Sequence, residues 1–403
     1  MMLLHAAPSL RPGGGPAGYL YNLWTELKGL QGEQAVAVVA QEVSHERTAY
    51  SAASPVFLLL YKSRRWVPGC AMALALWLKA AHDSRAGLSQ QWINRIKGAD
   101  AVVFHDFRLF VRYLNTPRAR FPHGSRPKGL LMLHSPTNPS SELAEFWRSG
   151  FSTGRATRLA ERVWRKMELR AIREATALIA PTKHALDGYF RGSEEARHIL
   201  SATKILELPS GVPPLIPEKP RTEVRQSIGC DHDDLAIGYV GRMVLDKGYD
   251  RFLAIADAVS KSGRRNIRMF GIGIGPLSNS TAAPGVLSEL GWRTDMADVI
   301  SALDIVIVPN RIAYFDLVIL EAMSLGKTIY TTNIGGSKDL ASGSVRYLSD
   351  GDTNEIASNF VSIIDDLILE TPEYIRHIYN CEYSVSSFVQ RHIALAKNLE
   401  RLL

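Results

Sequence analysis

Short apolar runs alternate with amphipathic helical segments along this chain, and this alternation limits its fold more than any other feature. The runs are continuously apolar, as in strands that are covered on both faces. Such a pattern is typical of parallel sheets with helices on both sides. It predicts nine strands, at 36–40, 101–105, 129–134, 177–180 and 205–208 in the first half and at 236–240, 267–271, 304–309 and 328–332 in the second.

Helices are predicted between these strands. The first would bury a stripe of residues at helical spacing, namely Leu20, Leu23, Trp24, Leu27 and Leu30. Two more are predicted at 249–259 and 317–325, each after a strand and a loop.

A proline-rich segment separates the two groups of strands. Four prolines between 211 and 220 cannot continue a helix or a central strand, so this segment is a linker. We therefore predict an α/β fold of two doubly wound, Rossmann-like domains, 1–212 and 213–379, with the last helix, at about 380–403, packed back on the first. Their parallel sheets would face each other across a cleft, where ligands bind at the carboxyl ends of the strands.

The two halves carry opposite charge. Residues 1–212 hold 28 Lys and Arg against 16 Asp and Glu, whereas the remainder holds 19 against 24. Six of the seven tryptophans also lie in the basic half: Trp24, Trp66, Trp77, Trp92, Trp147 and Trp164. Basic residues mixed with Trp suit an anionic membrane surface. Solvated cations and core tryptophans are the alternative.

Composition excludes several protein classes. Cys70, Cys230 and Cys381 are far apart and odd in number, which excludes a disulfide framework and a CxxC metal site and fits a reducing compartment. The first ten residues lack the features of a secretory signal. The most apolar stretch, 56–81, is interrupted by charged residues, so we expect no membrane-spanning helix and a cytoplasmic protein.

Two strand-to-helix turns in the second half indicate a ligand site. In the first, Gly241 permits a sharp turn after a buried strand, and Arg242 and Lys247 project from the loop. Arginine offers a planar fork to phosphate oxygens and lysine a point charge, so the pair suits a diphosphate. Two solvated cations are the alternative. A glycine-rich turn after the next strand includes Gly273, and its weight is mostly structural.

The second turn, Pro309–Met323, leads into a helix that begins near Asp316 and Leu317. Backbone N–H groups of its first turn would face an anion, helped by the helix dipole. Glu321 lies one turn further on an otherwise apolar helix, where an ionised carboxylate needs partners. Adjacent ribose hydroxyls would supply them, and a neighbouring loop is the alternative.

These blocks resemble the C-terminal domain of the retaining glycosyltransferases of family 4, which have the GT-B fold. That family shows G-R-(few residues)-K-G, G-x-G-P, P-S, E-x-F-G-x-x-x-x-E-A-M and G-G in this order. The chain has corresponding blocks at Gly241-Arg242 with Lys247-Gly248, Gly273-Ile274-Gly275-Pro276, Pro309-Asn310, Glu321-Ala322-Met323 and Gly335-Gly336. Weaker landmarks in the first half are Gly13-Gly14-Gly15, His105 and His134.

The resemblance implies how a donor is held. Arg242 and Lys247 would bind the diphosphate of a nucleotide-diphosphate sugar and stabilise the charge that it gains on leaving, which makes them catalytic. Glu321 would bind the ribose. Further donor contacts would come from Gly241, Gly273, Asp316 and Leu317. Enzymes of this fold generally need no metal, so we expect neither metal nor cofactor.

The resemblance also assigns residues of the first half. His134 would reach across the cleft towards the transferred sugar and act in catalysis. A strand-end histidine bonded to its own loop is the alternative for His134, and His105 is expected to be structural. Gly14 and Gly15 would let the first loop approach the diphosphate or the acceptor.

One departure from the family pattern matters. The family has two carboxylates eight positions apart, and the first would stand at Ala313. Asp316 replaces a usual glycine and would either cap the helix or turn towards sugar hydroxyls. The sugar therefore cannot be inferred from relatives. A catalytically silent relative, which binds a nucleotide sugar or supports a partner transferase, is the second hypothesis.

The acceptor is expected on the basic half. The segment 158–173 predicts an amphipathic helix with six cations on one face: Arg158, Arg162, Arg165, Lys166, Arg170 and Arg173. Such a helix is typical of a membrane surface or of a binder of acidic groups, although ordinary surface helices show the same pattern. The segment 56–78 is a second candidate for contact with lipid.

Together these patterns predict a retaining transferase that acts on a lipid-linked or anionic glycan acceptor. We expect it to build bacterial surface polysaccharide or glycolipid at the inner face of the cell membrane. A nucleic-acid binder is disfavoured, because the chain has no recognised nucleic-acid module.

Overall fold

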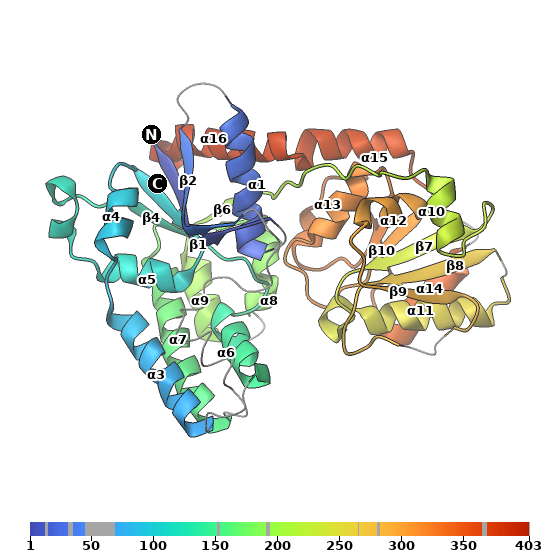
Figure 1. Ribbon diagram of the computed structural model, residues 1–403, viewed down its shortest axis with the longest axis horizontal. Helices are drawn as coiled ribbons and strands as arrows, with labels where there is room; N and C mark the ends of the chain where they lie inside the picture. Colours follow the sequence, from blue (N-terminus) through green and yellow to red (C-terminus); the bar gives the residue numbers. More distant parts are fainter. Residues whose placement is uncertain are drawn as a thin grey trace. The chain divides into compact units, whose positions relative to one another are not determined.

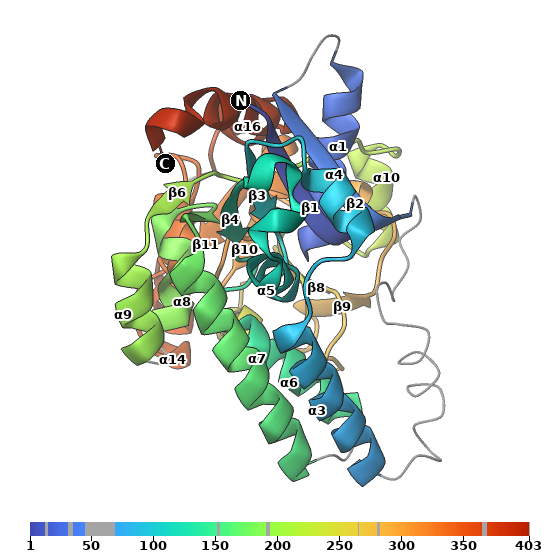
Figure 2. The same cartoon turned by 90° about the vertical axis from the view of Figure 1, so that its left-hand side faces the viewer.

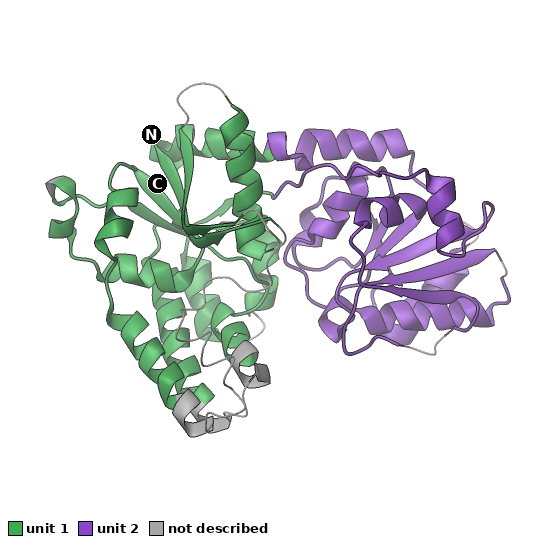
Figure 3. Ribbon diagram, viewed as in Figure 1, with its two compact units in different colours: residues 1–209, 388–403 green, residues 210–387 purple. Residues whose placement is uncertain are grey.

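The computed structural model describes residues 1–12, 15–30, 35–44, 69–150, 154–190, 194–264, 266–279, 283–364 and 369–402. They form two compact units, coloured separately in Figure 3: unit 1 comprises 1–209 and 388–403, and unit 2 comprises 210–387. Unit 1 thus ends three residues before the expected boundary, and most of helix α16 (Val385–Leu402) is grouped with it.

Unit 1 is built on a six-stranded sheet in the order β2-β1-β3-β4-β5-β6, and every strand pair is parallel. The strands are β1 (Leu3–Leu10), β2 (Val36–Val43), β3 (Ala101–Phe104), β4 (Lys128–Met132), β5 (Ala177–Ala180) and β6 (Ile205–Glu207). Strands β3 and β5 are buried at every residue, which explains their continuous apolar sequences.

Helices connect these strands (Figure 1). They are α1 (Gly15–Gly29), α3 (Gly69–Arg85), α4 (Gln90–Ile96), α5 (Phe107–Asn115), α6 (Pro139–Gly150), α7 (Gly154–Glu174), α8 (Asp187–Phe190) and α9 (Glu194–Ala202). Helices α3 and α7 lie side by side and extend away from the sheet (Figure 2). On α1, Leu20, Leu23 and Leu27 are buried as predicted, whereas Trp24 is half-buried and Leu30 is exposed, because the helix ends at Gly29.

Unit 2 has its own six-stranded parallel sheet, in the order β12-β11-β10-β7-β8-β9. Its strands are β7 (Leu235–Val240), β8 (Ile267–Ile272), β9 (Leu287–Gly291), β10 (Ile305–Val308), β11 (Thr328–Thr331) and β12 (Arg346–Tyr347). Its helices include α10 (Arg221–Ser227), α11 (Tyr249–Lys261), α12 (Met296–Ala302), α13 (Leu317–Ser324), α14 (Thr353–Ser362) and α15 (Pro372–Ile378).

Alternate residues of the central strands of unit 2 pack into two separate cores. Ile305 and Ile307 pack with residues of α11 and α14 on one face of the sheet, whereas Val306 and Val308 pack with residues of α12 and α13 on the other. Burial on both faces confirms the reading of these apolar runs as strands covered by helices. All nine predicted strands are present, with ends that differ by up to three residues.

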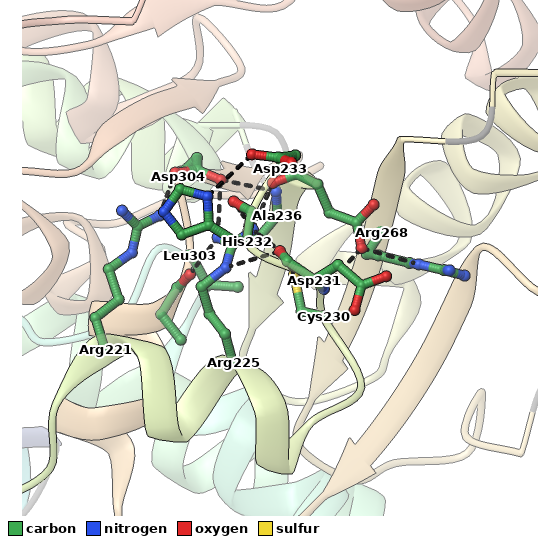
Figure 4. Close-up of polar contacts among 12 residues, drawn as sticks. Arg221, Arg225, Cys230, Asp231, His232, Asp233, Ala236, Arg268, Leu303 and Asp304 are labelled. Carbon is green, nitrogen blue, oxygen red and sulfur yellow. Dashed lines mark hydrogen bonds and ion pairs between the residues drawn. The ribbon is translucent and has the colours of Figure 1, made fainter.

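One buried arginine holds the amino-terminal edge of the unit 2 sheet (Figure 4). Arg225 on α10 is 5% exposed and donates to the main-chain oxygens of Asp231 and Ala302 and to the carboxylate of Asp304. Asp304 also accepts from the main-chain N–H of Ala236 at 2.8 Å. These contacts join α10 to the starts of β7 and β10, so the opposite, carboxyl edge of the sheet is left for a ligand site.

Candidate functional site

The loops at the carboxyl edge of the unit 2 sheet pack backbone against backbone. Gly248, at the start of α11, has a φ of +66°, and a Cβ there would lie 1.9 Å from the carbonyl oxygen of Pro309. Gly273, after β8, has a φ of +139°, and its Cβ would lie 1.9 Å from the carbonyl oxygen of Gly241. Both approaches require glycine. The loops after β7, β8 and β10 therefore form one closely packed edge.

Lys247 and Asp316 link two of these loops. The Lys247 ammonium forms an ion pair with Oδ1 of Asp316, and the side-chain amide of Asn310 donates to Oδ2 at 2.6 Å. Asp316 occupies the N-cap position of α13, but its side chain makes no capping hydrogen bond. The capping role considered above is therefore wrong, and the carboxylate is instead held between an ammonium and an amide.

Arg242 lies in the same loop as Lys247 but does not share its ion pair with Asp316. Its side chain is exposed, and among the described residues its guanidinium makes no hydrogen bond or ion pair. The main-chain oxygen of Arg242 accepts from the hydroxyl of Tyr239 at 2.6 Å. Burial, and secondarily the charge of Asp316, raises the pKa of Tyr239, so its hydroxyl stays protonated and anchors the loop. Arg242 thus carries an exposed cation on an anchored loop, where an anion can reach it.

The other predicted residues of this edge lie on or before α13. Leu317 is its first residue, and Glu321 is half-buried on a helix whose other central residues are apolar. Ala313 is 3% exposed, and a Cβ at Gly335 would lie 2.0 Å from its carbonyl oxygen. The loop at Ala313 is therefore packed tightly against the turn after β11.

In unit 1, His134 is not bonded to its own loop among the described residues. It follows β4, and its Nε2 lies 2.6 Å from Nδ1 of His105, whose Nε2 lies 2.9 Å from Nδ1 of His5 on β1. The loop-bonded alternative for His134 is therefore wrong. Burial lowers the pKa of His134 to about 3 and holds the pKa values of His5 and His105 well below 6.5, so all three are neutral at pH 7.

His134 also lines a cavity of about 340 Å³ in unit 1. Its other lining residues include Pro16, His105, Asp106, Phe107, Arg108, Ser135, Glu142 and Leu143. The carboxylates are already engaged: Asp106 accepts from the main-chain N–H groups of Arg108 and Leu109 and so caps α5, and Glu142 accepts from the hydroxyl groups of Ser135 and Thr137. The cavity therefore combines fixed polar groups with apolar walls, as ligand sites do.

The first loop is described only in part. Gly14 lies outside the described residues, and Gly15 is the first residue of α1, with a φ of +71°.

The basic helix predicted at 158–173 is α7, and both of its predicted faces are present. The apolar side is buried at Ala160, Trp164, Met167 and Ala171 and half-buried at Val163. Of the cations, Arg165 and Arg170 form ion pairs with glutamates of the same helix.

Three other cations follow each other at four-residue spacing along α7. Arg158, Arg162 and Lys166 are exposed, and no ion pair to any of them forms within the described parts of the chain. They border a groove of about 880 Å³ that also includes Asn138 and Ser141. This row is the part of the basic half that best fits an anionic partner.

Four of the six tryptophans of the basic half have described side chains. Trp92 and Trp164 are buried in the core, Trp24 is half-buried, and Trp77 on α3 is 39% exposed. The second candidate for lipid contact is the segment 56–78, and its residues 56–68 lie outside the described residues.

In the described ranges, no three His, Cys, Asp or Glu side chains gather as a metal ion would need, and the metal-free reaction stays a prediction. Within the same ranges, each helix is too short or too polar to cross a bilayer.

Part of unit 2 matches a known family. Residues 234–366 match the family model described as "Glycosyl transferases group 1". Residues 234–366 therefore resemble the group 1 glycosyltransferases. The matched segment contains Arg242, Lys247, Asp316 and Glu321.

Curated relatives match a minor part of this chain. The D-inositol 3-phosphate glycosyltransferase of Rhodococcus erythropolis is 31% identical over 132 residues, which are 29% of this chain and 30% of that protein. The enzyme of the same name from Thermobispora bispora is 27% identical over 167 residues, 36% of this chain and 39% of that protein. The chain thus spans well under half the length of these relatives.

Solved structures resemble the whole chain. HepE of Anabaena in complex with UDP is 18% identical with a TM-score of 0.58, covering 100% of both chains. WaaG, a glycosyltransferase involved in lipopolysaccharide biosynthesis, is 16% identical with a TM-score of 0.58, covering 98% of this chain and 99% of its own. These likenesses, together with the two parallel six-stranded sheets, confirm the predicted GT-B fold.

Proposed function

We propose that this protein transfers a sugar from a nucleotide-diphosphate sugar to a lipid-linked or anionic glycan acceptor, with retention of the anomeric configuration. One observation carries the proposal: Arg242 is an exposed, unpaired cation among the described residues, in the loop that also holds Lys247, inside the segment that matches the family. HepE has been solved with UDP and with UDP-glucose, which supports this class of donor.

The diphosphate of the donor binds Arg242 and Lys247 in this proposal. The guanidinium supplies a planar fork and the ammonium a point charge. Main-chain N–H groups from Leu317 onward add the dipole of α13, and Glu321 binds the ribose. Negative charge on the diphosphate grows as the glycosidic bond breaks, so these cations stabilise the transition state more than the bound donor.

The leaving phosphate itself accepts the proton of the attacking hydroxyl in this proposal, on the same face of the sugar. No carboxylate nucleophile is then required, unlike in retaining hydrolases. His134 is the contribution of unit 1, as a neutral side chain that bonds to an oxygen of the transferred sugar.

The acceptor meets α7 in this proposal. Arg158, Arg162 and Lys166 would attract the phosphates or carboxylates of an acidic glycan or of lipid headgroups. Their four-residue spacing on one helix gives an anionic chain or surface several cations at once. The reaction would then take place at the cytoplasmic face of the membrane, in the synthesis of a surface glycan.

A thermal-shift screen with UDP, GDP, ADP and their sugars tests the donor site. A ligand that binds only the folded state at about 100 times its Kd adds roughly 2.7 kcal/mol to the free energy of unfolding. We expect one nucleotide to raise Tm, and Arg242→Ala and Lys247→Ala each to remove most of the rise. Lys261→Ala is the control, because Lys261 is an exposed cation of α11 paired with Asp257. An undiminished rise in both site variants would refute the site.

A silent relative is the second candidate, and the alanine at position 313 favours it. The family carboxylate is absent there, and the loop is tightly packed. A silent protein would bind nucleotide but never separate it from its sugar. An assay for free nucleotide released from the nucleotide sugar distinguishes an active transferase from a silent relative. It is run with and without vesicle extracts that contain acceptors.

A further inference from the structure

Three histidines of unit 1 form a hydrogen-bonded row. His5 lies on β1, His105 directly follows β3 and His134 follows β4, and these strands are neighbours in the sheet. Nδ1 of His5 lies 2.9 Å from Nε2 of His105, and Nδ1 of His105 lies 2.6 Å from Nε2 of His134. The order of the strands thus sets three imidazole rings end to end.

Neutral imidazoles allow only two arrangements of protons in such a row. Each ring has one N–H and one bare nitrogen, and each hydrogen bond needs one of each. Burial keeps the rings neutral by lowering their pKa values. The position of one proton therefore determines the positions of the others. All the N–H groups point either towards His134 or towards His5.

The two ends of the row differ. Nε2 of His5 is buried and has no hydrogen-bond partner among the described residues. At the other end, Nδ1 of His134 makes no hydrogen bond within those residues, and His134 lines the cavity of about 340 Å³. The N–H group that is not used within the row therefore lies at one of its two ends. It is either on the buried Nε2 of His5 or on Nδ1 of His134, which an occupant of the cavity can reach.

The surroundings of His5 offer its Nε2 no acceptor. The nearby ring of His392 lies 4.9 Å away between centroids. His392 must donate from Nδ1 to the carbonyl oxygen of Phe388 at 2.8 Å, because a carbonyl only accepts. Its Nε2 is therefore bare and accepts the hydroxyl proton of Tyr19 at 3.0 Å. A buried N–H without a partner is rarer in proteins than a buried acceptor without one, so His5 keeps its Nε2 bare.

We propose that His5 and His105 are positioning residues that hold His134 as its Nδ1–H tautomer, so that His134 donates a hydrogen bond to an oxygen of a ligand in this cavity. The ligand oxygen belongs to a hydroxyl or a phosphate. In this state His134 cannot act as a base through Nδ1, because that nitrogen carries the proton. The tautomer follows from the row alone and goes beyond the proposed function, which gave no role to His5 and His105.

Long-range ¹H–¹⁵N correlation spectra of the full chain, labelled with ¹⁵N-histidine, test the proposal at pH 7. These spectra distinguish a protonated Nδ1 from a protonated Nε2, and the His134 signals are assigned as those missing in His134→Gln. We expect His134 to be protonated at Nδ1 in the wild-type protein. The measurement uses the protein without ligand, so its result is independent of whether the chain transfers a sugar.

A matched pair of variants tests the positioning role. His105→Gln keeps a donor and an acceptor in the row, so His134 should remain protonated at Nδ1. His105→Phe removes both, and the Nε2–H form of His134 should then appear. Protonation of Nε2 in the wild-type protein would overturn the proposal, whether or not the His105 variants fold. A His134 tautomer that is unchanged in a folded His105→Phe variant would also overturn it.

Discussion

The ion pair between Lys247 and Asp316 joins the loop after β7 to the start of α13. The Asp316 side chain is 9% exposed and is held on its other oxygen by Asn310, whereas the Lys247 side chain is 31% exposed. An anion that approaches Lys247 therefore meets a fixed carboxylate that already shares the ammonium. If this site binds the donor as proposed, the carboxylate of Asp316 lowers its affinity for a diphosphate.

Asp316→Asn should therefore tighten the binding of the nucleoside diphosphate that gives the largest thermal shift. The substitution keeps the shape of the side chain and removes one negative charge near the phosphates. We expect a Kd about five-fold lower at low salt, or about 1 kcal/mol, by calorimetry. Asp257→Asn is the control, because Asp257 forms an exposed ion pair with Lys261. An unchanged or weaker affinity for Asp316→Asn would show that the carboxylate does not oppose the ligand.

Gly248→Ala should destabilise unit 2 much more than Gly263→Ala. The two glycines have similar φ values, +66° and +75°, but an added Cβ meets the carbonyl oxygen of Pro309 at 1.9 Å at Gly248 and nothing within 4 Å at Gly263. The backbone term alone costs about 1–2 kcal/mol, so we expect that loss for Gly263→Ala and at least 2 kcal/mol more for Gly248→Ala. Denaturant unfolding followed by circular dichroism measures both. Equal losses would mean that the loops at this edge can move apart.

The sequence predicts most clearly the strands that are buried on both faces. Ile305–Val308 and Ala177–Ala180 have no exposed side to interrupt their apolar runs. Three strands escape this pattern. Strand β1 contains a histidine and a proline, β9 contains Ser288 and Glu289 at the edge of its sheet, and β12 has only two residues. Polar residues within a strand, or a length of only two residues, interrupt the continuous apolar signal, whereas the apolar start of β2 was predicted although β2 lies at the edge of its sheet.

The candidate site residues were chosen by motif, and their partners could not be predicted in this way. Asp316 follows Lys247 by 69 positions, and nothing local indicates that they pair. His5 and His392 each stand alone in their segments, and only the strand order β1-β3-β4 and the return of α16 to unit 1 bring them near His105. The sequence contained one indication of the row, because His105 and His134 are both the last residues of predicted strands. Without the strand order it could not be interpreted.

Arg225→Ala should destabilise unit 2 by about 3–5 kcal/mol, because it leaves several main-chain oxygens without their buried donor and removes one of the cations paired with the partly buried carboxylate of Asp304. Arg221→Ala is a matched control. Arg221 pairs with the same carboxylate, but its side chain is 47% exposed against 6% for Arg225, and exposed pairs contribute about 0–1 kcal/mol. Denaturant unfolding of both variants measures the difference. Losses of similar size would contradict the assignment of Arg225 as the residue that holds this edge.

Replacing Arg158, Arg162 and Lys166 together by alanine should weaken binding to anionic lipid vesicles. Each cation near such a surface contributes about 1 kcal/mol, so we expect roughly a 100-fold loss, measured by vesicle sedimentation at low salt. The control replaces three exposed cations elsewhere in unit 1, Lys97, Arg118 and Lys128. Equal losses in the two triple variants would indicate a general effect of charge. No loss in either would remove the membrane from the proposed function.

The stability of unit 1 should fall as the pH drops below about 6.5, with His392 as one named cause. Burial lowers the pKa of His392 to about 4, although its bond to the Phe388 carbonyl opposes the shift and Arg391 adds to it. Between pH 6.5 and 4 the unfolded chain binds a proton at this residue and the folded chain does not, so stability falls with pH. From pH 7 to 4.5 the loss from His392 is about 3 kcal/mol.

Denaturant unfolding between pH 7 and 4.5 measures this loss through tryptophan fluorescence, because six of the seven tryptophans belong to unit 1. His392→Gln has no titratable group there. It should be less stable than the wild-type protein at pH 7, since it disturbs the bond to Tyr19, yet lose about 3 kcal/mol less on acidification. The remaining slope would come from His5, His105 and His134, whose pKa values burial also lowers. Parallel curves for the two proteins would mean that His392 is already protonated, or reaches solvent, in the folded state.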